Sequence, residues 1–159
     1  MPDRPARLYD KDFVRWSEEQ AAALRAAAQA GTNLPLDWDN LAEEVESLGI
    51  SQRHELRNRI ATIIEHLLKL EYSPATRPHN GWIATVGRAR LQIERVLDDS
   101  PSLRREVPAI VASELPRTAK LVARMLQNRG EGVPELAARL AAAEYTPEQV
   151  LGDWYPEDR

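Results

Sequence analysis

Three polar residues that can support chemistry recur at seven-residue intervals in the middle of the sequence: Gln52, Arg59 and His66. Seven residues make about two turns of an α-helix, so these side chains would form a column along one helix face. An arginine can hold an anion there, and a histidine can act as an acid or a base near neutral pH. The spacing defines a candidate catalytic column, to which Glu44 and Glu55 add two carboxylates.

The same column also has a purely structural interpretation, and we favour it. Polar groups at the border of an apolar helix face must find hydrogen-bond partners, and a neighbouring helix commonly supplies them. Arg59 and His66 resemble the R-x6-H spacing of the helical HEPN ribonucleases, but Ile60 stands where that family usually has a polar residue. An enzyme of the hydrolase or ribonuclease type that uses Arg59 and His66 therefore remains the alternative hypothesis.

The element that must position this column is the stretch from Asp37 to Tyr72. Its apolar residues recur in steps of three and four, which predicts an amphipathic helix. Gly49 weakens that helix, because an interior glycine costs about 1 kcal/mol relative to alanine. We expect one long helix bent near Gly49 or two nearly aligned helices. The apolar positions are Trp38, Leu41, Val45, Leu48, Leu56, Ile60, Ile63, Leu67 and Leu70.

Capping residues and prolines divide the rest of the chain into further helices. Asp10 or Asp12 can cap a first helix that ends near Ala30, just before Gly31. Its expected inner stripe is Phe13, Trp16, Ala23, Leu24 and Ala27. We expect a second flanking helix that has Trp82 on its inner face and ends at 98–99, followed by a short turn over 101–106. A helix over 108–128, kinked at Pro116, should come next. Two short helices should follow, one over 134–143 and one after the Thr146 capping box.

The predicted fold is therefore all-α, a helical bundle around a long central helix at about 37–72, with shorter C-terminal helices. A chain of 159 residues fits a single domain, here 1–159. Residues 1–8 would form a loose N-terminal arm. Residues 152–159 would form a tail that lays Trp154 or Tyr155 against the bundle.

The composition excludes several classes of site. The chain has no cysteine, which removes thiolate nucleophiles and cysteine-based metal centres. Glu43, Glu44 and Glu46 suggest a carboxylate metal site, but the sequence lacks the Glu-x-x-His pairs of di-metal bundles. A solvated, acidic helix start explains these glutamates. We expect no metal and no cofactor.

The charge distribution bears on the choice of partner. The net charge is −4, which argues against a dedicated nucleic-acid binder, and residues 1–50 hold 10 acidic and 5 basic side chains. The arginines near Trp82 fit a solvated outer face. No apolar run approaches the ~20 residues of a membrane span, and the start lacks a signal-peptide core. We expect a cytoplasmic protein that does not bind membranes.

Several motifs together resemble one bacterial family, catalogued as domain of unknown function 29. They are WDNLAEEVESLG, RHELRNRIATIIEHLLKLEYSP, a tryptophan in GW, and DSPSLR, with YDKDFVRWSEEQAAALR near the start and YTPEQVLGDWYP near the end. The resemblance covers nearly the whole chain and implies an all-helical fold in a bacterial cytoplasm. It implies no activity. The matching residues are Trp38, Asn40, Leu41, Glu43, Glu44, Glu46, Ser47, Leu48, Gly49, His66, Leu67, Leu68, Lys69 and Trp82.

The sequence thus favours a non-catalytic interaction or regulatory protein. A long amphipathic helix without a recognisable catalytic set suits a surface for another protein or for a second copy of the chain. A homo-oligomer or a protein partner is therefore expected.

Overall fold

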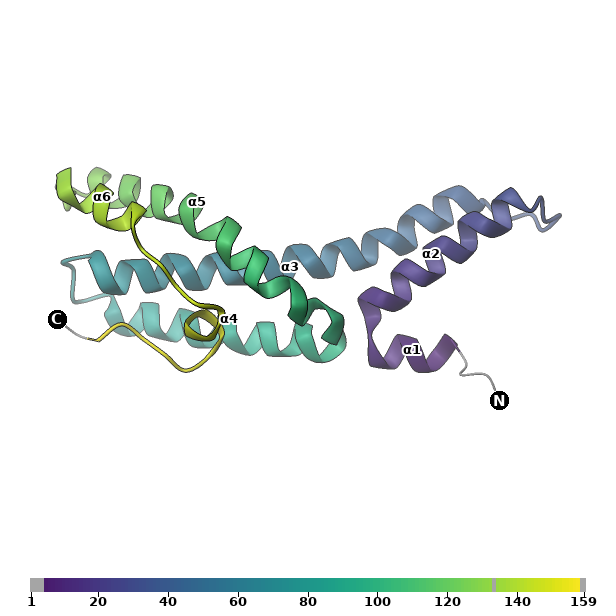
Figure 1. Cartoon of the computed structure of the whole chain (residues 1–159), viewed down its shortest axis with the longest axis horizontal. Coiled ribbons are helices and arrows are strands. Elements are labelled where there is room, and N and C mark those ends of the chain that lie inside the picture. The colour runs from purple at the N-terminus through teal and green to yellow at the C-terminus, as the bar shows by residue number, and fades with distance from the viewer. Residues whose placement is uncertain (1–4, 133, 158–159) are drawn as a thin grey trace. The chain divides into compact units, whose positions relative to one another are not determined.

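The structure, a computed structural model, describes residues 5–132 and 134–157, and over these residues it contains α- and 3-10 helices and no strand (Figure 1). The all-α prediction with a long helix and shorter C-terminal helices is confirmed. The elements are α1 (Pro5–Lys11), α2 (Phe13–Gln29), α3 (Trp38–Tyr72), α4 (His79–Asp99), the 3-10 helix η1 (Pro101–Glu106), α5 (Val107–Asn128), α6 (Pro134–Ala141) and α7 (Pro147–Leu151).

These helices group into two compact units, each described by itself below. Unit 1 comprises Met1–Leu56 and Arg95–Arg105, and unit 2 comprises Arg57–Glu94 and Glu106–Arg159. Helices α3 and α4 contribute residues to both units. The expectation of a single domain over 1–159 stays a prediction.

Helix α3 is a single helix of 35 residues, so the stretch 37–72 forms one helix and not two. The bend near Gly49 stays a prediction. It begins after Asp37, whose Oδ1 accepts a hydrogen bond from the Asn40 amide at 3.3 Å. This bond satisfies one of the free N–H groups of the first turn. Gly49 lies inside the helix without ending it.

Gly49 is required by the close approach of α2 to α3 in unit 1. A Cβ at Gly49 would meet Ser17 Oγ at an impossibly short distance and would lie 3.6 Å from the Val14 carbonyl oxygen. Val14, Ser17 and Ala21 are buried at three- and four-residue spacing, and Ala42 is buried on α3. Small side chains thus let the two helices pack closely, at the cost of glycine's low helix propensity.

The inner stripe expected for the first helix is therefore wrong. Phe13 and Trp16 are only half-buried and Ala23 is exposed. The helix is rotated so that its smallest residues face α3, because a close helix contact selects side chains by size before hydrophobicity.

The large aromatic residues of α2 instead gather with Tyr9 of α1. The Tyr9 ring lies edge-on to Trp16, with ring centroids 4.8 Å apart, and to Phe13 at 5.6 Å. Edge-to-face packing of this kind favours the pair beyond the area it buries. Residues 5–8 consequently belong to α1 and are not part of a loose arm, while residues 1–4 lie outside the described residues.

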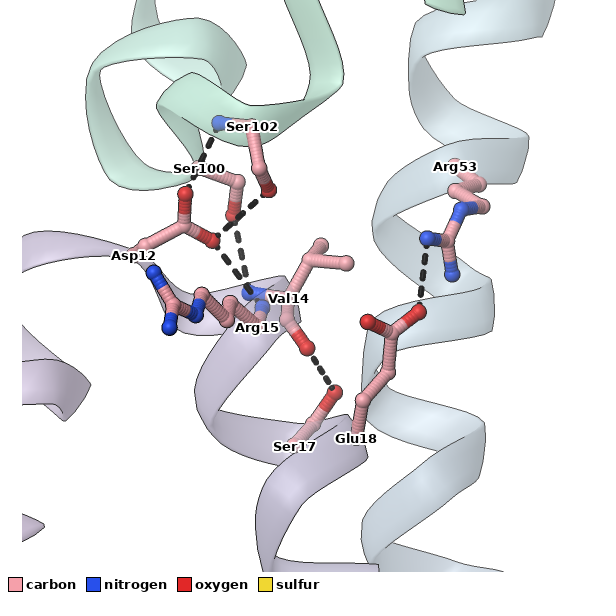
Figure 2. A network of polar contacts seen from close by, with 8 residues as sticks. All are labelled: Asp12, Val14, Arg15, Ser17, Glu18, Arg53, Ser100 and Ser102. Atoms are coloured by element: carbon pink, nitrogen blue, oxygen red, sulfur yellow. Dashed lines mark hydrogen bonds and ion pairs between the residues drawn. The ribbon is translucent and has the colours of Figure 1, made fainter.

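Asp12, at the start of α2, connects the two stretches of sequence that make up unit 1 (Figure 2). Its carboxylate caps α2 by accepting from the Arg15 amide at 2.9 Å. It also accepts from the Ser102 amide at 2.8 Å and the Ser102 hydroxyl at 3.0 Å. The Val14 amide donates to Ser100 Oγ at 3.2 Å, so η1 and its preceding residue satisfy the free groups of the α2 N-terminus.

In unit 2 the buried faces are mostly aliphatic. Fully buried leucines and isoleucines from the second half of α3 form the centre, and α4, α5, α6 and α7 add further apolar residues. The α3 positions are Ile60, Ile63, Ile64, Leu67 and Leu68. The predicted helical periodicity is confirmed for this half of α3 and for the inner face of α4.

Arg90 holds the C-terminal segment of unit 2. It is only 7% exposed, and its guanidinium donates to the carbonyl oxygens of Val150 at 3.0 Å, Gln149 at 2.9 Å and Trp154 at 2.7 Å. It also lies over the Tyr155 ring, 4.7 Å from the centroid. Burial lowers the pKa of this guanidinium from its ordinary value. The sequence predicts that Trp154 or Tyr155 lies against the helices. It places the arginines near Trp82 on a solvated outer face, which is wrong for Arg90.

Replacing Gly49 by alanine tests the α2–α3 contact. Overpacking costs about 1–3 kcal/mol, and the gain in helix propensity returns about 1, so Gly49→Ala should lower the free energy of unfolding by about 1 kcal/mol. Ser17→Ala should rescue it, because the next atom, Ser17 Cβ, is 3.5 Å from the added methyl group. Urea denaturation of both single variants and the double variant measures this coupling.

Gly87→Ala is the matched control, because a Cβ there meets only Tyr155 Oη at 3.9 Å. It should leave stability unchanged or raise it. Additive effects of Ser17→Ala and Gly49→Ala would contradict the close contact.

Candidate functional site

The column proposed from the sequence has two members in unit 2, Arg59 and His66. Both are half-buried, and His66 Nδ1 lies 2.8 Å from the Thr62 carbonyl oxygen. Nδ1–H donates this bond in the neutral ring, which leaves Nε2 as the acceptor. Arg59 also has an interaction partner. Seven residues of helix separate the two by about 10 Å along the axis.

This geometry agrees with a histidine and an arginine that serve packing. A bond to the carbonyl one turn earlier fixes the imidazole against its own helix, and the hollows described below are lined by other residues. The use of Arg59 and His66 in catalysis stays an untested prediction.

The other three members lie in unit 1, and their environments differ. Glu44 is exposed, and Glu55 is half-buried with an interaction partner. Gln52 is half-buried, but its Oε1 is buried without a hydrogen-bond partner. An unsatisfied buried carbonyl oxygen costs about 1–3 kcal/mol, so Gln52 is the member of the column whose position calls for an explanation.

Gln52 lines a hollow of about 370 Å³ in unit 1. The other lining residues are Tyr9 of α1, Asp10 of α1, Phe13 of α2 and Asp99 of α4. The hollow thus combines two carboxylates, two aromatic rings and an amide whose oxygen lacks a donor. Its described lining residues supply acceptors and π-faces and include no basic side chain, which suits a positively charged group.

Next to Gln52, a stripe of apolar residues on α3 is open to solvent. Leu41 is 39% exposed and Leu48 is 45% exposed, with Val45 half-buried between them. The sequence placed these residues on the inner face, which is wrong for both leucines. Ala42 and Gly49 take the buried positions, because the close contact with α2 turns α3 towards its small residues.

Ion pairs hold the other flank of the α2–α3 contact. Arg25 pairs with Glu46 at 2.6 Å, and Arg53 pairs with Glu18 at 2.7 Å. The hydrogen bond from Arg25 and its charge lower the pKa of Glu46. On a helical wheel Glu46 and Arg53 lie on one side of Ala42 and Gly49, and Leu41, Val45 and Leu48 lie on the other. One flank is thus closed by charge pairs and the other presents apolar side chains.

A polar hollow of about 390 Å³ lies in unit 2, and two of its polar lining residues are already hydrogen-bonded to other residues. Of its lining residues, Glu71 accepts a hydrogen bond from the Tyr145 hydroxyl at 2.7 Å and Ser73 donates to Glu131 at 3.0 Å. Burial raises the pKa of Tyr145 well above its ordinary value, so this hydroxyl remains a donor. The first bond ties the segment before α7 to the end of α3, and the second ties the residue after α3 to the segment between α5 and α6.

The described residues contain neither a metal-binding cluster nor a membrane-spanning helix. No group of three or more His, Asp or Glu side chains among them could hold a metal ion. No helix in the described part of the chain is both long and apolar enough to cross a bilayer.

Comparison with known proteins identifies the family of this all-helical chain. The chain belongs to the family described as domain of unknown function DUF29, whose model matches residues 8–155. A search of curated proteins found no match. A solved structure, an alpha-helical protein of unknown function from Rhodospirillum rubrum, is similar with a TM-score of 0.66 and 20% sequence identity, covering 93% of this chain and 98% of that one. At this identity the similarity concerns the fold alone.

The sequence therefore identified Gln52 but missed its surroundings. Tyr9, Asp10 and Asp99 come from segments that no spacing rule connects to Gln52. One signal in the sequence pointed to Asp10. Asp10 and Asp12 were both candidate caps for the first helix, and because Asp12 caps α2, the carboxylate of Asp10 does not serve as its cap.

Proposed function

We propose that this protein is a non-catalytic interaction protein that docks an α-helix of a partner protein on the stripe Leu41, Val45 and Leu48. The exposure of this stripe carries the proposal. Two leucines one heptad apart, with a valine between them, form the seam that a packed helix fills in bundles. Leu34 and Leu36, 61% and 49% exposed in the segment before α3, add apolar surface to the same unit.

The charge around the stripe favours a basic partner helix. Exposed Glu44 lies beside Leu41 and Leu48 on the helical wheel, and residues 1–50 hold 10 acidic against 5 basic side chains. A helix with leucines on one face and lysines or arginines at its edges would match both the apolar seam and the acidic surroundings.

A second copy of the chain fits this surface less well. Two copies would bring the same acidic surroundings together, and like charges at an interface oppose association. We therefore favour a different protein over a homo-oligomer. The bacterial cytoplasm implied by the family resemblance is the proposed setting, and the solved structure of similar fold comes from Rhodospirillum rubrum.

A synthetic amphipathic helix tests this proposal. One peptide carries leucines at three- and four-residue spacing with lysine and arginine flanks, and a second has glutamate in place of those basic residues. Calorimetry should show binding of the basic peptide, and Leu41→Glu/Leu48→Glu should weaken it at least about tenfold, since charge is forced into an apolar seam. Both leucines are exposed, so the fold should tolerate the change.

Ile83→Glu/Leu121→Glu is the matched control, because these residues of unit 2 are 40% and 49% exposed. It should bind the basic peptide like the unmodified protein. Equal binding of both peptides, or no effect of the stripe variant, would refute the proposal. A dimer in light scattering that the stripe variant dissociates would replace the partner helix by a second copy.

A further inference from the structure

The hollow around Gln52 has a composition that neither packing nor the apolar stripe explains. Asp10 and Asp99 are exposed carboxylates on different helices, and they border the same hollow as the rings of Tyr9 and Phe13. The ring centroids of Tyr9 and Phe13 are 5.6 Å apart, with their planes at 74°. The two rings thus present differently oriented surfaces beside two negative charges.

We propose that this hollow binds an organic cation, an alkylammonium or guanidinium group. Both groups are donors without acceptors, so they complement the two carboxylates, and both are attracted to aromatic faces. A metal ion would instead require a tight set of oxygen ligands, and no such group occurs among the described residues.

The amide of Gln52 supplies an independent observation. Its Oε1 is buried and has no hydrogen-bond partner, although the residue lines the hollow. The terminal torsion of a glutamine is broad, so rotation about it can turn this oxygen towards a group inside the hollow. A bound ammonium or guanidinium would then supply the missing donor.

The position of Gln52 connects the hollow to the docking stripe. Leu41, Val45, Leu48 and Gln52 follow one another at steps of four, three and four, so Gln52 continues the same line along α3. A helix lying on the stripe would bring one of its side chains to the hollow. The cation has two possible sources. One is a lysine or arginine of the docked helix, and for this source the inference rests on the proposed function. The other is a free polyamine.

Two kinds of probe separate these sources. Spermidine and N-acetyl-arginine amide present the cation alone, and the basic helical peptide presents it on a helix. In calorimetry at low salt, Asp10→Asn/Asp99→Asn should weaken every probe that uses the hollow about tenfold or more. Asp39→Asn/Glu43→Gln removes the same charge from unit 1 outside the hollow and should change affinity much less.

Gln52→Met adds a second readout. It should weaken cation binding, yet raise the melting temperature of the free protein, because it removes an unpaired buried oxygen from a side chain of similar length. A melting temperature that falls would show that the oxygen already has a structural role, and it would overturn the inference.

The outcomes also separate this inference from the proposed function. Spermidine binding that requires Asp10 and Asp99 but survives Leu41→Glu/Leu48→Glu supports the cation site, even if no helix docks. Binding of the helical peptide that is equally sensitive to the hollow and control variants refutes the cation site and leaves the docking proposal intact. No measurable binding of any probe overturns the inference.

Discussion

Replacing Arg90 by methionine is expected to lower the free energy of unfolding of unit 2 by about 3–4 kcal/mol. The guanidinium donates to three backbone carbonyl oxygens in a nearly buried position. Methionine keeps the apolar stem of the side chain but leaves those acceptors without donors, and hydrogen bonds to charged groups contribute about 1.5–3 kcal/mol each. The loss should be less than the full sum, because the C-terminal segment can detach and become hydrated.

Hydrogen exchange measures this effect where it should occur. The amides of residues 146–155 should exchange much faster in Arg90→Met, and the melting temperature should fall. Arg88→Met is the matched control on α4, because Arg88 is exposed and donates a hydrogen bond of 3.3 Å to the Thr85 hydroxyl of its own helix. Unchanged protection of the C-terminal segment would show that Arg90 is not its anchor.

Replacing Asp12 by alanine is expected to destabilise unit 1 by about 2–3 kcal/mol. The change removes a helix cap, which contributes about 1 kcal/mol, and also the charged acceptor of the Ser102 amide and hydroxyl. Both donors of Ser102 would then have to find water in a partly buried position.

Asp37→Ala separates the two roles of Asp12. Asp37 caps α3 at an exposed position, where its carboxylate accepts hydrogen bonds from the backbone amide and the side-chain amide of Asn40. Its removal should cost about 1 kcal/mol, so urea denaturation should show a clear excess for Asp12→Ala. Equal losses for the two variants would mean that the bridge to Ser102 contributes nothing.

Capping residues and glycines predicted the helix boundaries well, because the interactions that start and end a helix involve only residues close in sequence. A cap depends only on the next three residues, and Asp12 and Thr146 both accept the amide hydrogen bonds expected of them. Gly31 and Gly130 have φ values of 69° and 73°, the left-handed conformation expected just beyond a helix end. None of these features needs knowledge of a neighbouring helix.

Which face of a helix is buried could be predicted only where large residues decide it. In the second half of α3 the isoleucines and leucines mark one face, and they are buried as expected. In unit 1 the contact is made by Ser17, Ala21, Ala42 and Gly49, which a hydrophobicity pattern ranks low. Close packing depends on the shape of both helices, and one sequence segment does not contain that information.

The candidate site was predicted in part for the same reason. Gln52 was found because seven-residue spacing is a local property of a helix. Its partners in the hollow depend on where α1, α2 and α4 lie, which spacing does not encode. Arg59 and His66 share the spacing, but the bond of His66 to Thr62 could not be read from it.

The most direct test of the account is the chemical-shift map of the protein titrated with the basic amphipathic peptide. Helix docking predicts that the largest shifts fall on residues 41–52 of α3 and on the facing residues of α2, with those around Gln52 moving also when spermidine alone is added. Shifts concentrated in unit 2, or none at peptide concentrations well above that of the protein, would contradict it.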